Sequence, residues 1–328
     1  MAADSLVAVS YPADDEFAQI NTQVLGGSAR VAFLHGRPEG EVREILSEAD
    51  VLLGWHLGEE LPAGALHDSA RLRFVQLLSA GADSVDYAAL PERLLLASNV
   101  GAYAQPMAEY VMAVTLALAR RLPQRHAEMA RGEFGMWKPV LTLDGAVCAV
   151  LGFGGIGKAS ARLMRVFGAR IQAVNTSGRS SEPTDFIGTL ADLDKLLAAA
   201  DVLLIALPLT RATRGLIGAR ELRLMKPSAI LVNVGRAAIV DERALYEHLR
   251  DHPGFCAGLD TWWHEPGPGS AFSTRYPFFD LPNIIGSPHN SGVTDDALQV
   301  GARTAAENVR RFLRGEAVIG VVRREDYL

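Results

Sequence analysis

The sequence is poor in cysteine and has no long hydrophobic run, and each absence excludes a class of protein. Its 328 residues include two cysteines, Cys148 and Cys256, too few for a disulfide-stapled secreted domain. Cys148 lies in the apolar run 146–151, so we expect a buried, reduced thiol. No apolar run reaches the roughly 18 residues of a membrane span, and residues 1–15 lack the pattern of a secretory signal. We therefore expect a cytoplasmic protein with no membrane contact.

Charge of one sign is not concentrated in the chain. The net charge is −6, and lysine and arginine are scattered rather than blocked, so no field would gather nucleic acid. The eight histidines form no ligand pattern of the HExxH kind, and no metal site is expected. With 49% hydrophobic residues, a chain of this length can bury a sizeable core and is expected to form two domains.

Short apolar runs alternate with helical patterns, which predicts parallel sheets flanked by helices. In the first part of the chain, such runs predict strands at 6–9, 31–34, 51–53, 74–78 and 94–97. A second series predicts six strands, at 146–152, 170–174, 202–207, 229–234, 255–259 and 284–285. Six strands with crossover segments match a doubly wound dinucleotide-binding fold.

Two long helices and one irregular stretch complete the predicted organisation. Pro106 opens an apolar helix over 107–121, as suits proline in a first turn. An amphipathic helix over 294–313 is expected to return to the first domain, with its apolar positions at Val300, Ala305, Val309, Phe312 and Leu313. The stretch 265–283 is rich in glycine and proline, and irregular segments of that length are often functional.

A glycine-rich fingerprint lies between an apolar strand and a helical pattern, the context that a dinucleotide site requires. Gly152 permits a tight turn, Gly154 lets backbone N–H groups approach a pyrophosphate, and Gly157 lets the helix pack closely on the sheet. The cofactor-binding residues predicted from this motif are Gly152, Gly154, Gly155, Ile156 and Gly157.

The next predicted strand ends at Asn175, where a carboxylate would bind the ribose hydroxyls of NAD. No acid stands there, and Asn175, Ser177 and Arg179 instead offer neutral donors and a guanidinium, which suit a 2′-phosphate. This pattern favours NADP(H), with NAD(H) possible. The alternative is a solvated loop in which the side chain of Arg179 contacts nothing.

Four motifs then occur in order, at 151–157, at 206–210 with 213–217, at 231–236 with 240–242, and at 258–266 with 287–292. Through them the chain resembles the D-isomer-specific 2-hydroxyacid dehydrogenase family. The resemblance implies an α/β protein of two doubly wound domains, with a Rossmann dinucleotide-binding domain inserted in a smaller flavodoxin-like one. Residues 1–101 and 290–328 are expected to form the substrate-binding domain, and residues 102–289 the NAD(P)-binding domain.

The resemblance also implies roles for individual side chains. Arg236 matches the arginine that binds the substrate carboxylate, His289 the acid and base that exchanges a proton with the substrate oxygen, and Glu265 the carboxylate that holds the imidazole and favours its charged form. Segments 79–83 and 99–101 look like the substrate loops of the family, with Ala80, Gly81 and Asn99 as substrate-binding residues. The further cofactor-binding residues that it implies are Leu207, Pro208, Thr213, Val234, Gly235, Asp260 beside the nicotinamide carboxamide, and Ser291.

The expected function is the interconversion of a small 2-ketoacid and its D-2-hydroxyacid, of the glyoxylate or hydroxypyruvate reductase type. Glu265 favours hydroxyacid chemistry over the formate dehydrogenase branch, in which a glutamine is typical. A dehydrogenase for a bulkier 2-ketoacid and a catalytically silent dinucleotide-sensing module remain alternatives. A homodimer is expected from the family and from the helix 107–121. In one departure, Gly235 stands where the family usually has alanine or serine, and Ala237 where it has glycine.

Overall fold

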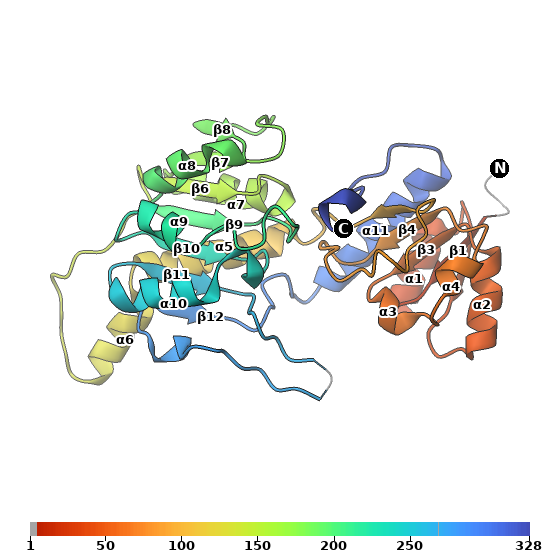
Figure 1. Ribbon diagram of the computed structural model, residues 1–328, viewed down its shortest axis with the longest axis horizontal. Helices are drawn as coiled ribbons and strands as arrows, with labels where there is room; N and C mark the ends of the chain where they lie inside the picture. The colour runs from red at the N-terminus through yellow and green to blue at the C-terminus, as the bar shows by residue number, and fades with distance from the viewer. Residues whose placement is uncertain (1–4, 268) are drawn as a thin grey trace. The chain divides into compact units, whose positions relative to one another are not determined.

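The computed structural model describes residues 5–267 and 269–328, which form two compact α/β units (Figure 1). The first unit runs to Tyr103 and resumes from Thr294 to Leu328, and the second is Ala104–Val293. The sequence predicts the domain boundaries at 101/102 and 289/290, within a few residues of these divisions. The substrate-binding and dinucleotide-binding roles of the two units stay predictions. Residues 1–4 of the predicted first domain and residue 268 of the predicted irregular stretch lie outside the described residues.

The first unit is built on a parallel sheet of five strands in the order β2-β1-β3-β4-β5, the flavodoxin-like order expected of the substrate-binding domain. All five predicted strands are present, as β1 (Leu6–Val9), β2 (Arg30–Phe33), β3 (Val51–Gly54), β4 (Phe74–Leu77) and β5 (Leu95–Ala97). The helices of this unit are α1 (Asp15–Leu25), α2 (Glu39–Glu48), α3 (Leu57–Glu60), α4 (Ala65–Asp68), α11 (Ala297–Leu313) and the 3₁₀ turn η4 (Arg324–Asp326).

Helix α11 belongs to the first unit, where it packs against α1, β3 and β4. It begins at Ala297 rather than at the predicted Thr294, because residues 291–296 form turns. Ala305 and Val309 are fully buried, as predicted. Val300 was wrongly assigned to the apolar face, since it is 42% exposed.

The second unit contains a parallel sheet of seven strands in the order β12-β11-β10-β9-β6-β7-β8, the order of a doubly wound dinucleotide-binding sheet. The six predicted strands are present as β6 (Val147–Leu151), β7 (Arg170–Val174), β9 (Val202–Ile205), β10 (Ile230–Asn233), β11 (Cys256–Leu259) and β12 (Ile284–Gly286). The prediction of six strands was wrong by one, β8 (Phe186–Gly188). β8 lies at the sheet edge, and its apolar residues Phe186 and Ile187 directly follow a segment of polar residues, glycine and proline at 175–185.

Helices cover both faces of the second sheet (Figure 1). They are α5 (Ala104–Ala119), α6 (Leu122–Ala130), α7 (Gly155–Val166), α8 (Leu193–Ala199), α9 (Ala219–Leu224) and α10 (Glu242–Asp251), with 3₁₀ turns η1 (Leu190–Asp192), η2 (Ala237–Ile239) and η3 (Phe278–Asp280). Helix α5 contains Pro106 in its first turn and starts at Ala104 instead of Met107. It ends before the predicted Arg121, which has a left-handed backbone with φ of 54°.

Helix α5 lies against α7 and packs on β10, β11 and β12. Close contact with β11 is possible because that strand presents Gly258 to the side chain of Val114. Both cysteines are buried free thiols, and burial raises the pKa of the Cys148 thiol to about 12, which confirms the predicted inert thiol. Within the described part of the chain, no helix combines the length and apolar character that a membrane crossing requires.

The contact between Gly258 and α5 predicts that added volume destabilises the second unit. A methyl group at Gly258 would come within 2.3 Å of the Val114 side chain, so Gly258→Ala should lower the free energy of unfolding by about 1–3 kcal/mol. Gly40→Ala is the control, because nothing lies within 4 Å of a side chain there. Chemical denaturation of both variants checks this, and equal stabilities would contradict the contact.

Candidate active site

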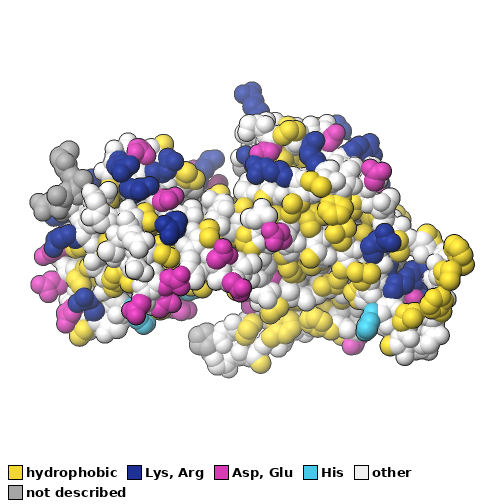
Figure 2. All heavy atoms as spheres, turned by 180° about the vertical axis from the view of Figure 1, so that it is seen from behind, with side chains coloured by type: hydrophobic (Ala, Val, Ile, Leu, Met, Phe, Trp, Pro, Cys, Tyr) yellow, Lys and Arg dark blue, Asp and Glu magenta, His cyan; other side chains and the backbone are white. Residues whose placement is uncertain are grey.

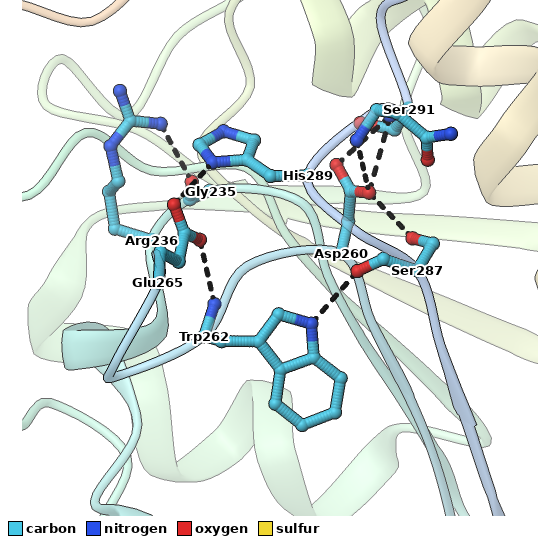
Figure 3. Close-up of polar contacts among 9 residues, drawn as sticks. Gly235, Arg236, Asp260, Trp262, Glu265, Ser287, His289 and Ser291 are labelled. Atoms are coloured by element: carbon cyan, nitrogen blue, oxygen red, sulfur yellow. Dashed lines mark hydrogen bonds and ion pairs between the residues drawn. The ribbon is translucent and has the colours of Figure 1, made fainter. Parts of the chain in front are cut away.

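A histidine and a glutamate form a hydrogen-bonded pair at the carboxyl end of the second sheet (Figure 3). The Nδ1 atom of His289 lies 2.8 Å from Oε2 of Glu265. Because a carboxylate only accepts, Nδ1 carries the proton and donates, which leaves Nε2 for a substrate. The side chains are 43% and 35% exposed, respectively. This geometry suits an imidazole that exchanges a proton with a ligand.

The carboxylate of Glu265 stays charged at neutral pH. Partial burial acts to raise its pKa, but the hydrogen bonds from His289 and from the backbone N–H of Trp262, with the positive charges of His289 and Arg236, outweigh that effect. The pKa of Glu265 is therefore lowered from its usual value. A charged carboxylate at Nδ1 fixes the tautomer and the orientation of the His289 ring.

The backbone at His289 is left-handed, with φ of 52°. This conformation costs a non-glycine residue roughly 1–2 kcal/mol, so contacts around the turn must maintain it. The N–H of His289 donates to the carbonyl of Asp260 at 2.8 Å. The carboxylate of Asp260 is buried and accepts from the N–H groups of Asn290 at 3.0 Å and Ser291 at 3.2 Å. In this structure Asp260 holds the turn that carries His289, and its predicted contact with the nicotinamide stays a prediction.

Arg236 follows β10 with an extended backbone, at φ of −138°. Its Nη1 donates to the carbonyl of Gly235 at 2.9 Å, and Asn233 fixes the loop by donating to the carbonyl of Arg236 at 3.0 Å. A side chain at Gly235 would lie 2.7 Å from the carbonyl oxygen of Leu207. The departure at Gly235 is therefore a steric requirement of this backbone, which has no room for alanine or serine.

Sequence reasoning did not single out Asn233 as a functional residue. It is fully buried at the end of β10, and its Oδ1 also accepts from the N–H of Gly235 at 3.0 Å. The sequence feature that could have indicated its role is a polar side chain at the end of an apolar strand, shortly before the predicted arginine.

The glycine fingerprint adopts the geometry expected of a dinucleotide turn. Gly152 has φ of 95°, and a side chain there would lie 2.6 Å from the carbonyl oxygen of Ala206. A side chain at Gly157 would lie 2.2 Å from the carbonyl oxygen of Gly152. Gly154 caps the N-terminus of α7, and a side chain built on it would meet open space. The turn therefore leaves room at a helix N-terminus, where a pyrophosphate fits.

The predicted ribose loop is ordered by Asn175. Its side chain donates to the carbonyl of Arg179 at 2.8 Å and accepts from the N–H of Ser177 at 3.1 Å. Asn175 thus shapes the loop, while the guanidinium of Arg179 is exposed and forms no hydrogen bond with the residues that the structure describes. An exposed cation at this place suits a phosphate, and its role stays a prediction.

The remaining predicted cofactor residues follow the ends of neighbouring strands. Thr213 is buried and donates to the carbonyl of Pro208 at 2.7 Å, which closes the loop that follows β9. Gly155 and Ile156 begin α7. Leu207 follows β9, and the buried Val234 follows β10. Ser291 lies after β12, where its N–H donates to Asp260.

The predicted substrate-loop residues lie in the first unit, with Ala80 and Gly81 after β4 and Asn99 after β5. Asn99 is buried, and its side chain donates to the carbonyls of Leu78 at 3.1 Å and Gly301 at 2.9 Å. The segment with Ala80 and Gly81 is closed by the hydroxyl of Ser79, which donates to the carbonyl of Gly81 at 2.8 Å. Asn99 therefore holds this segment rather than presenting its own amide.

An aromatic cavity of about 380 Å³ borders the His289–Glu265 pair within the second unit. Its walls include Trp262, Phe272 and Phe279, whose rings pack with centroids 5.1–6.1 Å apart. The sequence showed these phenylalanines only as members of an irregular stretch. Among the residues described, no group of three or more His, Cys, Asp or Glu side chains is arranged to hold a metal ion.

Comparison with known proteins decides the family. The model of the D-isomer specific 2-hydroxyacid dehydrogenase NAD binding domain matches residues 112–291. The chain belongs to this family. D-3-phosphoglycerate dehydrogenase of Methanocaldococcus jannaschii is 30% identical over 96% of the chain, which spans 59% of that relative's length. Glyoxylate reductase of Aeropyrum pernix is 33% identical over 85% of the chain and 84% of its own length.

A solved structure agrees with this family assignment. The D-isomer specific 2-hydroxyacid dehydrogenase from Xanthobacter autotrophicus, in complex with NADPH, matches with a TM-score of 0.82 and 26% identity, over 99% of this chain and 100% of that one. The resemblance drawn from the motifs is confirmed, and so is the α/β fold. Membership makes the protein an oxidoreductase with a nicotinamide dinucleotide cofactor. The substrate and the form of the dinucleotide do not follow from these comparisons.

The charge of Glu265 predicts the pH dependence of ketoacid reduction. The lowered pKa of Glu265 keeps its carboxylate ionised near neutrality. Glu265→Gln removes this negative charge from beside the proposed proton donor, so the alkaline limb of the rate of reduction should move to lower pH. Glu247→Gln, which removes an exposed partner of Arg243, is the control. An identical pH profile in Glu265→Gln would show that the pair does not act in catalysis.

Proposed function

We propose that this protein reduces a small 2-ketoacid of the glyoxylate or hydroxypyruvate kind to its D-2-hydroxyacid. The observation that carries the proposal is the 2.8 Å contact between His289 and Glu265, with Arg236 beside the pair (Figure 3). These three side chains supply a proton, a charge that retains it, and a guanidinium for a carboxylate. Family membership, reported above, supports the same reaction class.

The chemistry divides between the cofactor and the chain. A bound nicotinamide dinucleotide supplies the hydride to the carbonyl carbon of the ketoacid. His289 donates the proton on Nε2 to the carbonyl oxygen as that oxygen gains charge, and the ring becomes neutral. Glu265 stabilises the imidazolium before the transfer through the hydrogen bond at Nδ1. In the direction of oxidation the neutral ring accepts the hydroxyl proton, and the same carboxylate stabilises the product.

Binding of the substrate is assigned to Arg236. Its planar guanidinium can bind a carboxylate with two parallel hydrogen bonds, and Asn233 fixes the backbone from which it extends. A glycine at 235 keeps the loop against the backbone of Leu207. Ala80 and Gly81 retain their expected role as substrate-binding residues within this proposal, and the buried Asn99, also predicted to bind substrate, instead holds their segment in place.

A bulkier 2-ketoacid is the second candidate substrate, because one observation favours it. The cavity beside His289 is lined by Trp262, Phe272 and Phe279, and apolar rings favour an aromatic or branched side chain over the hydrogen of glyoxylate. Reduction of phenylpyruvate in preference to glyoxylate and hydroxypyruvate, in one panel of ketoacids, would decide for this candidate.

The homodimer is also part of the proposal. Several large apolar side chains between residues 122 and 140 are exposed, among them Leu122, Met129, Phe134, Met136 and Trp137, which is 89% exposed. Figure 2 shows hydrophobic side chains gathered on the second unit. Exposed apolar side chains in such number are typical of a surface that binds another protein.

Replacement of the proposed proton donor tests the reaction. His289→Ala should lower the rate of ketoacid reduction by about 10²- to 10⁴-fold, because no other group supplies the proton. The dissociation constant of the dinucleotide should hardly change. His67→Ala is the matched control, since His67 is an exposed side chain of α4 in the first unit. Single-turnover measurement gives the rate, and a loss of only a few fold would remove His289 from the mechanism.

The form of the dinucleotide is proposed to be NADP(H), with NAD(H) possible. The proposal follows from the exposed guanidinium of Arg179 and the absence of an acid at Asn175. A charge-assisted contact to the 2′-phosphate is worth about 1.5–3 kcal/mol, which corresponds to a preference for NADPH of about 10- to 150-fold in kcat/KM.

Arg179→Ala should therefore remove most of the NADPH preference, and Asn175→Asp should shift the preference toward NADH by adding a ribose acceptor and repelling the phosphate. Arg303→Ala, which removes an exposed arginine of α11, is the control. Steady-state kinetics with both dinucleotides give the ratio. Equal use of NADPH and NADH by the unmodified protein would contradict the role of Arg179.

A further inference from the structure

One buried carboxylate organises the turn that carries His289. Asp260 is fully buried, and its Oδ1 accepts from the hydroxyl of Ser287 at 2.6 Å and from the N–H of Asn290 at 3.0 Å. Both of its oxygens lie 3.2 Å from the N–H of Ser291. Its backbone carbonyl accepts from the N–H of His289 at 2.8 Å. Three consecutive N–H groups, at 289, 290 and 291, therefore converge on Asp260, and Figure 3 shows its carboxylate between Ser287 and Ser291.

A chain of hydroxyl groups extends from Asp260 to helix α5. The hydroxyl of Tyr110 lies 2.6 Å from Oγ of Ser287. Taken by itself, this distance allows either hydroxyl to be the donor. Ser287 has one hydroxyl proton, and a carboxylate only accepts. Ser287 must therefore donate to Asp260, and Tyr110 must donate to Ser287. The direction of each hydrogen bond is fixed, from the helix toward the buried carboxylate.

Ser287, in the middle of this chain, and Tyr110, at its end on α5, are both held in place. The backbone of Ser287 is fixed by its carbonyl, which accepts from Nε1 of Trp262 at 2.8 Å, and by its N–H, which donates to Leu259 at 2.9 Å. Tyr110 lies in α5, which packs on β10, β11 and β12. Burial raises the pKa of the Tyr110 phenol, against the hydrogen bond with Ser287, and the charge of Asp260 raises it further. The phenol is therefore neutral and able to donate near neutral pH.

We propose that Tyr110 is a positioning residue for His289, because through Ser287 and Asp260 it fixes the turn that aims the imidazole at Glu265. The inference rests on the proposed function, in which His289 donates the proton. A left-handed histidine keeps its conformation only while the surrounding contacts impose it. Without the phenol hydroxyl, Oγ of Ser287 loses its donor, so the hydroxyl group is held less firmly against Asp260 and the turn is less well fixed.

Tyr110→Phe tests the proposal, because it removes one oxygen and keeps the ring. We expect kcat for ketoacid reduction to fall about 5- to 50-fold, since a small misplacement of a catalytic group has a large effect on rate. The KM for the ketoacid and the dissociation constant of NADPH should stay within about twofold. The alkaline limb of the pH profile should move to lower pH, because the imidazole meets Glu265 less often. Tyr246→Phe is the control: the Tyr246 ring packs on Tyr276 and Phe278, and its replacement should change none of these quantities.

Variants of Ser287 test the connection itself. Ser287→Ala should reproduce the effect of Tyr110→Phe, and the double variant should be no slower than Ser287→Ala alone, because the chain is already broken. Ser287→Thr keeps a hydroxyl group and should restore most of kcat. If Tyr110→Phe does not fold, the comparison of Ser287→Ala with Ser287→Thr carries the test.

Histidine ¹⁵N NMR provides a measurement that does not need turnover. The Nδ1 signal of His289, assigned by its loss in His289→Ala, reports the hydrogen bond to Glu265 and should change in Tyr110→Phe but not in Tyr246→Phe. If the unmodified protein reduces no 2-ketoacid and this signal still changes, the proposed function fails and the positioning role stands. An unchanged signal, kcat and pH profile in Tyr110→Phe overturns the proposal. A loss confined to dinucleotide affinity also overturns it, because Asp260 would then serve the cofactor.

Discussion

All seven strands of the second unit run in the same direction, and the site depends on this constraint. The carboxyl ends of parallel strands lie at one edge of the sheet, where ligands bind in doubly wound folds. The glycine turn follows β6, the Asn175 loop follows β7, and Arg236 follows β10. Glu265 and His289 come after β11 and β12. Residues distant in sequence thus share one edge because the crossover helices return each strand to the same starting side.

Buried polar side chains support the exposed residues of the site. Asn233 ends β10 and binds the N–H of Gly235 and the carbonyl of Arg236. Asp260 directly follows β11 and binds the turn after β12. Both side chains are buried, so their hydrogen bonds are not exchanged with water and hold the backbone firmly. The side chains proposed to meet the substrate are themselves more exposed than the residues that support them.

The sequence predicted much of the fold, because buried parallel strands are apolar throughout. Val202–Ile205 and Ile230–Asn233 are recognisable from composition alone. The edge strand β8 carries a weaker signal, because its two large apolar residues directly follow a loop of polar residues, glycine and proline at 175–185. The sequence predicts the start of α5 at Met107, after Pro106, whereas the helix begins at Ala104, because proline is tolerated throughout the first turn.

The candidate site was predictable as a set of motifs but not as a geometry. His289 and Glu265 are separated by an irregular stretch whose path no periodicity describes, and their 2.8 Å contact is known only from the structure. The contact between Tyr110 and Ser287 joins positions 177 apart in the sequence, and neither residue belongs to a pattern that names the other. The aromatic cavity likewise depends on how Phe272 and Phe279 fold onto Trp262.

The close approach of Gly235 to the backbone of Leu207 has a mechanical consequence. The loop after β10 carries Arg236, and the loop after β9 carries predicted cofactor residues. The two loops touch at Gly235, where a side chain would lie 2.7 Å from the carbonyl oxygen of Leu207. Neither loop can shift toward the other, so displacement of one displaces both. A larger residue at position 235, introduced from a relative, would therefore push the two loops apart. The loop that carries Arg236 and the loop after β9 would have to be exchanged together.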